Sequence, residues 1–272
     1  MCDTDAVTSA RQPTSEPIAA PGTDPPSPPR AAGIRARARA EMTREIMQTA
    51  RRHLAVDGAA GLSLRAVARD MGMVSSAVYR YVPSRDELLT RLIIEAYDSL
   101  GEAVEQAERK VPRDALGDRF RAVAGGVRHW AIAHEHEYAL IYGSPVPGYR
   151  APQDTVGPAT RVPGVLIAII SDALAAGVAP SDLHTIPGDV AASIEPVRAS
   201  FAAGGQHIPE DLVVRGLMAW TYLFGAVSFD LFGHRHNVVL DERDPNNPFV
   251  RYETEKIITL IGLPERIIRT DR

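Results

Sequence analysis

The sequence has 272 residues, 45% of them hydrophobic, and a formal net charge of −4. This length fits one large domain or two modest ones with a real core. No stretch approaches the roughly 18 uncharged apolar residues that a membrane span needs, so we expect no membrane partner. Cys2 is the only cysteine, which excludes internal disulfides and multi-cysteine metal sites. The start shows no secretory signal, which predicts a cytoplasmic location.

The charge is unevenly distributed. Residues 30–91 contain 12 Arg and 6 Asp plus Glu, whereas the segments on either side are acidic. Nucleic-acid binding requires a locally positive surface and not a basic chain as a whole, because affinity comes largely from counterion release at phosphates. A solvated helical surface explains the same charges equally well.

Residues 1–36 form a predicted disordered tail, because they are rich in proline, serine and alanine and offer little to bury. Within and after this tail, Arg35, Arg37 and Arg39 alternate with alanine. They could form a flexible arm that reaches a DNA minor groove. The start of a frayed, solvated helix is the simpler interpretation, and we favour it.

Helical spacing of apolar residues predicts a first helix from about Arg39 to Val56, ended by Gly58. Ser63 is a suitable N-cap for a second, short helix with an apolar face. Gly72 ends that helix, and a third begins within two residues. The apolar face of the second helix consists of Leu64, Val67, Ala68 and Met71.

Two short helices joined by a tight glycine turn, after a longer helix, are typical of a helix-turn-helix. In this motif the second short helix enters the DNA major groove. On that helix, Val74, Val78 and Tyr81 repeat at helical spacing and are expected to face inward. This leaves Ser75, Ser76, Tyr79 and Arg80 on the outer face.

A sharp start is predicted for the fourth helix, where Ser84 and Glu87 match a capping box. Its apolar stripe from Leu88 to Leu100 indicates a long helix that enters a second core. Arg85 is unfavourably placed in the first turn, where the helix dipole prefers anions. A neighbouring DNA phosphate would explain an arginine at this position.

The stretch LSLRAVARDMGMVSSAVYRYVPSRDELL, with its surroundings from about residue 37 to 99, resembles the DNA-binding domain of TetR-type transcriptional regulators. The resemblance implies a base contact from Arg65. It also implies base reading by Ser75, Ser76 and Ala77 beside Arg80, and phosphate contacts from Ser63, Tyr79, Tyr81 and Arg85. Val74 stands where many members have serine, so the recognition helix is expected to lack this N-cap hydroxyl and to begin one residue later.

Residues 100–272 are expected to form a larger helical domain, which makes the fold all-α. The resemblance to the family implies that this domain dimerises and holds a small-molecule effector. The stretch VRHWAIAHEHEYALIYGSPVPGY is similar to the regulatory domain of the WHG type. Glycine and proline boundaries predict helices at 114–141, 164–176, 187–203, 209–233 and 248–261.

Four side chains at i, i+4, i+8 and i+12 form an aromatic and polar strip that could line an effector pocket, although an ordinary core helix is at least as good an explanation. They are Trp130, His134, Tyr138 and Tyr142. The spacing of His129, His134 and His136 does not suit a helical zinc site, so no metal is expected. No nucleophile elbow, phosphate loop or dinucleotide fingerprint occurs, which predicts no enzyme and no cofactor.

A dimer interface is predicted on the last two helices, because the run from Leu212 to Gly233 is too apolar for a one-sided surface helix. Plain burial inside one subunit is the alternative. The residues assigned to the interface are Leu217, Trp220, Phe224, Val227, Ile257 and Ile261.

The function expected from these features is a homodimeric repressor that binds a palindromic operator on double-stranded DNA and is released by a small molecule. Activation of transcription is a further possibility within the same class. The competing class is an adaptor that uses the helix-turn-helix only to contact proteins.

Overall fold

The structure is a computed structural model that describes residues 29–264, except 179, 181, 206, 242 and 245. The described residues divide into two units, one that ends at Glu41 and one that begins at Met42. Residues 1–28, most of the predicted tail, lie outside the described part. Residues 29–36, also assigned to that tail, are helical, so the helix begins ten residues earlier than the predicted Arg39.

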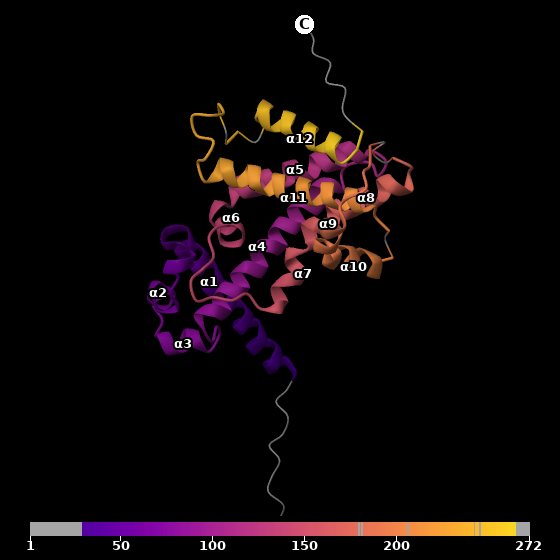
Figure 1. Ribbon diagram of the computed structural model, residues 1–272. Coiled ribbons are helices and arrows are strands. Elements are labelled where there is room, and N and C mark those ends of the chain that lie inside the picture. Colours follow the sequence, from indigo (N-terminus) through magenta and orange to yellow (C-terminus); the bar gives the residue numbers. More distant parts are fainter. Residues whose placement is uncertain are drawn as a thin grey trace, which may run out of the picture. The chain divides into compact units, whose positions relative to one another are not determined.

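The elements within the described residues are all helical, which confirms the predicted all-α class (Figure 1). They are α1 (Pro29–Gly61), α2 (Leu64–Asp70), α3 (Ser75–Tyr79), α4 (Arg85–Glu108), α5 (Leu116–Ala133), α6 (Glu135–Tyr142), η1 (Gln153–Thr155), α7 (Val156–Ala159), α8 (Arg161–Ala175), α9 (Gly188–Ser193), α10 (Glu195–Ala203), α11 (Glu210–Leu231) and α12 (Pro248–Leu260).

The first core lies between the part of α1 after Met42 and helices α2, α3 and α4. Ile46, Val67, Val78 and Leu89 are all fully buried there. Gly58 interrupts α1 with φ of 66°, a left-handed conformation that favours glycine, and so confirms the predicted end of the regular helix. Leu140 of α6 also belongs to this core, a contact that the sequence did not indicate.

The second core is larger and lies between α4, α5, α6, α8, α11 and α12. The two cores share α4, because Leu92 and Ile93 pack in the first whereas Ala96 and Leu100 pack in the second. The transition therefore occurs within one turn of a continuous helix. A predicted domain boundary at residue 99 falls inside this helix and not at a linker.

Two predicted helices are broken in the structure. The expected helix 114–141 divides at His134, whose φ of −131° and ψ of 50° are not helical. The bend lets Tyr138 enter the second core while Leu140, two residues on, enters the first. The expected helix 187–203 likewise divides into α9 and α10 at Ile194.

Helix α11 is long and apolar enough to cross a membrane by length and composition, which corrects the expectation that no stretch of the sequence approaches a membrane span. The bent pair Gln153–Ala159 and Arg161–Ala175 passes the same test jointly. Leu212, Phe224 and Val227 of α11 are buried in the protein's interior. The hydrophobicity of α11 thus fits a core helix with a second apolar side.

Candidate DNA-binding surface and regulatory elements

The helix-turn-helix consists of α2, a turn at residues 71–74 and α3. Gly72 takes φ of 64°, and the Met73 N–H donates to the Ala68 carbonyl at 2.8 Å, which closes the turn. Ser63 occupies the predicted N-cap position of α2, but its side chain makes no capping hydrogen bond. Ser63 is half-buried, and its hydroxyl does not cap α2.

The recognition helix α3 begins at Ser75, one residue after Val74, in agreement with the later start expected from the valine. Val74 itself is 71% exposed, so the prediction that it faces inward is wrong. As the N-cap, Val74 precedes the first helical residue and has extended backbone, and therefore does not continue the inner face. Val78 is fully buried and Tyr81 packs partly against the first core.

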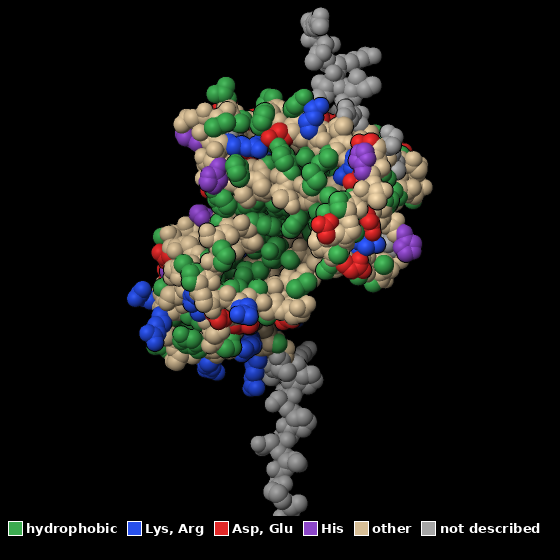
Figure 2. Space-filling view, viewed as in Figure 1, with side chains coloured by type: hydrophobic (Ala, Val, Ile, Leu, Met, Phe, Trp, Pro, Cys, Tyr) green, Lys and Arg blue, Asp and Glu red, His purple; other side chains and the backbone are tan. Residues whose placement is uncertain are grey.

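The residues predicted to contact DNA differ in exposure. Arg65, Ser76, Tyr79 and Arg80 are exposed, while the others are half-buried: Ser63, Ser75, Ala77, Tyr81 and Arg85. Lys and Arg side chains gather over α2 and α3, as Figure 2 shows. The structure thus brings the predicted residues into one region with positive charge around it.

Arg85 has a structural role that the sequence did not reveal. Its Nε donates to the Leu62 carbonyl at 2.9 Å, and its Nη2 donates to the carbonyls of Ala59 and Ala60 at 2.9 and 3.0 Å. These carbonyls follow the Gly58 kink at the end of α1, where a cation is favourable. A DNA phosphate is therefore not needed to explain an arginine at the start of α4.

Helix α4 begins at the predicted cap, but only half of the capping box is present. The Glu87 N–H donates to Ser84 Oγ at 3.0 Å. The Glu87 carboxylate instead accepts from Arg91 Nε at 2.7 Å, and Arg91 also donates to the Tyr81 carbonyl at 3.3 Å. This chain of contacts joins the end of the recognition helix to the first turns of α4.

The predicted aromatic strip does not line one cavity. Trp130 and His134 stack with ring centroids 4.9 Å apart, and both border two hollows beside α4, of about 530 and 270 Å³, that neither Tyr138 nor Tyr142 lines. Tyr138 is fully buried and donates its hydroxyl to the Phe224 carbonyl at 2.9 Å. Tyr142 packs against the Phe224 ring at 4.4 Å. The alternative of an ordinary core helix describes these two tyrosines better, since burial raises the pKa of Tyr138 to about 12 and also raises that of Tyr142.

Three of the six predicted interface residues are core residues, which corrects that part of the prediction. Phe224, Val227 and Ile261 are buried in the chain's own second core. Leu217 and Ile257 are half-buried, and Trp220 is partly exposed. Trp220 is as exposed as Tyr222, at 38% each. The other exposed apolar residues on α11 and α12 are Met218, Tyr222, Phe229, Phe249 and Tyr252, here called the outer face.

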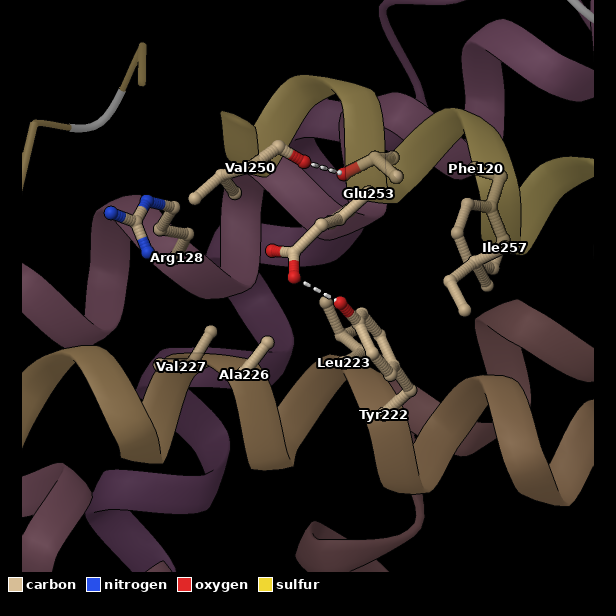
Figure 3. Close-up of a pocket in the computed structure, with 11 residues that line it drawn as sticks. Phe120, Arg128, Tyr222, Leu223, Ala226, Val227, Val250, Glu253 and Ile257 are labelled. Atoms are coloured by element: carbon tan, nitrogen blue, oxygen red, sulfur yellow. Dashed lines mark hydrogen bonds between the residues drawn. The ribbon is translucent and has the colours of Figure 1, made fainter. Parts of the chain in front are cut away.

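Beneath the outer face, polar side chains connect α5, α11 and α12. In Figure 3, Glu253 of α12 reaches the Tyr222 hydroxyl of α11, with Arg128 of α5 at one end of the space between them. Arg128 is buried in an ion pair with Asp230. The enclosed space is about 30 Å³, room for about one water molecule, so it does not suit an effector.

Helix α8 is attached to α4 by an arginine clamp. Arg161 donates from Nε and Nη2 to both carboxylate oxygens of Glu105, at 2.8 and 3.0 Å, and from Nη1 to Asp98. These hydrogen bonds lower the pKa of the Glu105 carboxyl. The buried Arg119 of α5 adds a second junction, because it pairs with Glu108 of α4 and with α8 through Asp172.

The residues that the structure describes include no group of three or more His, Cys, Asp or Glu side chains arranged to hold a metal ion. A solvent-facing recognition helix, joined by one long helix to a larger helical domain, defines a two-domain helix-turn-helix DNA-binding regulator.

Comparison with known proteins agrees with this class. Residues 46–92 match the model of bacterial regulatory proteins of the tetR family, and residues 120–247 match the tetracyclin repressor-like C-terminal domain. The chain belongs to the TetR family of transcriptional regulators. It is 44% identical over 206 residues to the HTH-type transcriptional regulator Rv1816 of Mycobacterium tuberculosis, covering 74% of this chain and 85% of the relative.

Solved structures show the same fold. The putative regulatory protein SCO4313 is 31% identical, with a TM-score of 0.64 over 82% of this chain and 98% of the other. A protein of unknown function from Rhodococcus sp. RHA1 is 24% identical, with a TM-score of 0.58 over 81% and 94%.

Proposed function

We propose that this regulator is a homodimeric, ligand-responsive repressor that binds an approximately palindromic operator and is released by a small molecule. The observation that carries the proposal is the recognition helix, whose exposed side chains Ser76, Tyr79 and Arg80 share one positively charged region. The relatives are transcriptional regulators, so no catalytic activity is part of the proposal. Its place of action is the cytoplasm, in contact with chromosomal DNA.

The base contacts of the proposal are Arg65 on α2 and Ser75, Ser76, Ala77 and Arg80 on α3. Small side chains at the front of α3 permit close approach of the backbone to the groove, and an arginine can pair with guanine. The proposed phosphate contacts are Ser63, Tyr79, Tyr81 and Arg85.

Arg85 fits both a structural and a phosphate role. Its Nε and Nη2 donate to carbonyls at the end of α1. Its Nη1 makes no hydrogen bond within the described part of the chain, and its side chain is half-buried. The carbonyl contacts fix the guanidinium and leave one end able to meet a phosphate oxygen.

Dimerisation is supported by the outer face of α11 and α12. Met218, Tyr222 and Phe229 follow one side of α11, and Phe249 and Tyr252 lie on α12, which packs beside it (Figure 1). Large exposed aromatic residues of this kind mark interaction surfaces. In a dimer about a two-fold axis, the same face of each subunit meets its copy, and two recognition helices reach successive major grooves roughly 34 Å apart.

A gel shift with the DNA upstream of this protein's own gene tests the proposal. We expect a specific complex that resists competitor DNA of unrelated sequence and weakens steeply with salt. Absence of a specific complex, or an affinity indifferent to salt, would contradict DNA recognition. A protein pull-down without any DNA complex would favour the adaptor alternative.

A further inference from the structure

A second cavity lies between α8, α10 and α11, away from the polar link beneath the outer face. It measures about 400 Å³, which falls in the range of roughly 300–1,000 Å³ typical of small-molecule sites. We call it the α8/α10/α11 cavity.

The walls of this cavity are almost entirely apolar. Ile167 and Ile170 come from α8, Phe201 from α10, and Leu212 and Leu217 from α11. Gly216 brings α11 close to α8, because a Cβ added there would lie 3.3 Å from Ile170 Cδ1. No Asp, Glu, Lys or Arg is among the described residues that line it.

Two residues of the lining nevertheless carry polar groups. They are Ser200 and Trp220, and both are exposed at the rim of the cavity. In the described part of the chain, neither the Ser200 hydroxyl nor the Trp220 indole N–H has a hydrogen-bond partner, although the indole ring packs beside Phe224. A mostly apolar site with a few convergent polar groups is the usual composition of a small-molecule pocket.

We infer that the α8/α10/α11 cavity binds an uncharged, largely apolar small molecule with at least one hydrogen-bonding group. An ionised ligand is disfavoured because its charge would lose water and find no counter-charge on the walls. Size favours a molecule of one to three rings over a peptide segment. This inference deepens the proposed effector response and rests on it for its regulatory meaning.

The cavity is also placed to affect DNA binding. Helix α8 presents Ile167 and Ile170 to the cavity, and it holds α4 through Arg161 and Glu105. Helix α4 then continues into the helix-turn-helix core through Leu89 and Leu92. A ligand that shifts α8 therefore acts on the helix that positions α3, by changing which arrangement of α4 is populated.

Binding of two related dyes to the full-length protein tests the inference. N-phenyl-1-naphthylamine is neutral and apolar, while 8-anilinonaphthalene-1-sulfonate has nearly the same rings and a sulfonate. We expect the neutral dye to bind with increased fluorescence and the sulfonated dye to bind at least about tenfold more weakly. Equal affinities, or no binding of the neutral dye, would overturn the inference.

Variants locate the binding site. Ile167→Trp adds volume to the cavity lining from α8, and Ser200→Phe adds volume from α10. If one of these variants does not fold, the other still tests the binding site. Each is expected to weaken the neutral dye at least about tenfold by removing volume. Gly164→Trp adds the same indole to an exposed position of α8 outside the lining and should leave the affinity unchanged.

Retained dye binding in both folded cavity variants would overturn the inference. The titration contains no DNA, so its outcome is independent of the gel shift. If the unmodified protein binds the neutral dye but forms no operator complex, the proposed function is contradicted and the inference about the cavity is not. If it forms the operator complex but does not bind the neutral dye, the inference about the cavity is contradicted and DNA recognition is not.

Discussion

At the scale of single residues, the Arg85 guanidinium stabilises the fold and also belongs to the proposed DNA-binding surface. Its three hydrogen bonds satisfy carbonyls at the end of α1, where the chain leaves regular helix at Gly58. Hydrogen bonds from charged donors contribute more to stability than neutral ones, and unpaired carbonyls in a half-buried place are costly. The start of α4 is thus tied directly to the end of α1.

Replacing Arg85 is expected to destabilise the protein. Arg85→Ala should lower the free energy of unfolding by about 1–3 kcal/mol, because three carbonyls lose a charged donor. Chemical denaturation followed by circular dichroism measures the change. Arg65→Ala is the matched control, since Arg65 is exposed on α2, and it should change stability by less than about 0.5 kcal/mol. Equal effects of the two variants would contradict the carbonyl role.

Arg80 and Arg85 are expected to differ in their effects on DNA binding. Arg80→Ala should relax sequence preference at one operator position by about 1–3 kcal/mol, because base contacts carry specificity. Arg85→Ala should weaken all sites alike and reduce the salt slope by about one. Competition gel shifts at several salt concentrations, with variants confirmed to be folded, measure both quantities. Identical behaviour of the two variants would refute this division of roles.

Local sequence rules placed α2, the glycine turn and the exposed Ser76, Tyr79 and Arg80 correctly, because periodicity and glycine act over a few residues. They failed at Val74, which precedes the helix and so escapes its periodicity. They also failed to explain Arg85, whose partners lie 23 to 26 residues earlier in the chain. Contacts across such separations are invisible to a short-range pattern.

At the scale of elements, α8 and α4 meet at a glycine. A Cβ added at Gly101 would lie 2.7 Å from Arg161 Nε and 2.9 Å from Arg161 Cβ. Gly101 is therefore the position at which the Arg161 side chain crosses α4 on its way to Glu105 and Asp98. A larger residue at position 101 would displace the Arg161 side chain from Glu105 and Asp98.

We expect Gly101→Ala to be destabilising despite the higher helix propensity of alanine. The propensity gain of up to about 1 kcal/mol is outweighed because Arg161 must leave Glu105 and Asp98. Gly164→Ala in α8 is the control, since its Cβ would meet open space, and it should leave stability unchanged or slightly higher. Thermal melts compare the two. A Gly101→Ala protein more stable than the parent would show that the clamp contributes nothing.

The outer face of α11 and α12 is expected to hold the dimer. The double variant Met218→Glu with Phe229→Glu should yield monomers, because both residues are more than half exposed, at 52% and 53%, and the two-fold axis would place four charges in the apolar interface. Light scattering after size exclusion measures the mass. Val238→Glu, exposed in the segment between the two helices, is the control and should remain dimeric. A dimeric double variant would move the interface elsewhere.

The predicted interface includes core residues of α11 for a physical reason. Phe224 and Val227 repeat at helical spacing, but so do Met218, Tyr222 and Phe229 on the other side. A helix that is apolar on both sides gives no amphipathic signal, so periodicity does not say which side meets the subunit's own core. Only packing against α5 and α12 decides it.

At the scale of the whole molecule, α4 makes the two cores one structure. Leu89 belongs to the first core and Leu100 to the second, and both are almost completely buried on the same helix. The segment after α6 also packs on the first core, where the hydroxyls of Tyr149 and Thr90 of α4 lie 2.9 Å apart. Residues from Met42 onward accordingly form a single compact unit.

Unfolding of this unit is expected to occur in one transition. Leu89→Ala and Leu100→Ala should each lower the free energy of unfolding by about 2–5 kcal/mol and shift the same transition, because each leaves a cavity in a core that shares α4. Differential scanning calorimetry at fixed protein concentration measures this. Two separate peaks, one moved by each variant, would show that the cores unfold independently.

The sequence predicts a DNA-binding part and a regulatory part, but it does not predict that their two cores share α4. Nothing in the pattern around the bend at His134 showed that Tyr138 and Leu140 would enter different cores. No glycine or proline marks this bend, so helix-ending rules had nothing to detect. The short helix α6 is thus a feature that only tertiary packing explains.

The packing of Leu140 and Tyr149 on the first core has a consequence for protein engineering. A chimera made by joining residues 42–99 to another regulator's effector domain would leave behind the side chains that cover this core, including Leu140 and the partner of Thr90. The transplantable module is discontinuous: it consists of the helix-turn-helix together with residues 140–149. Exchange of specificity between regulators of this kind requires both pieces to move together.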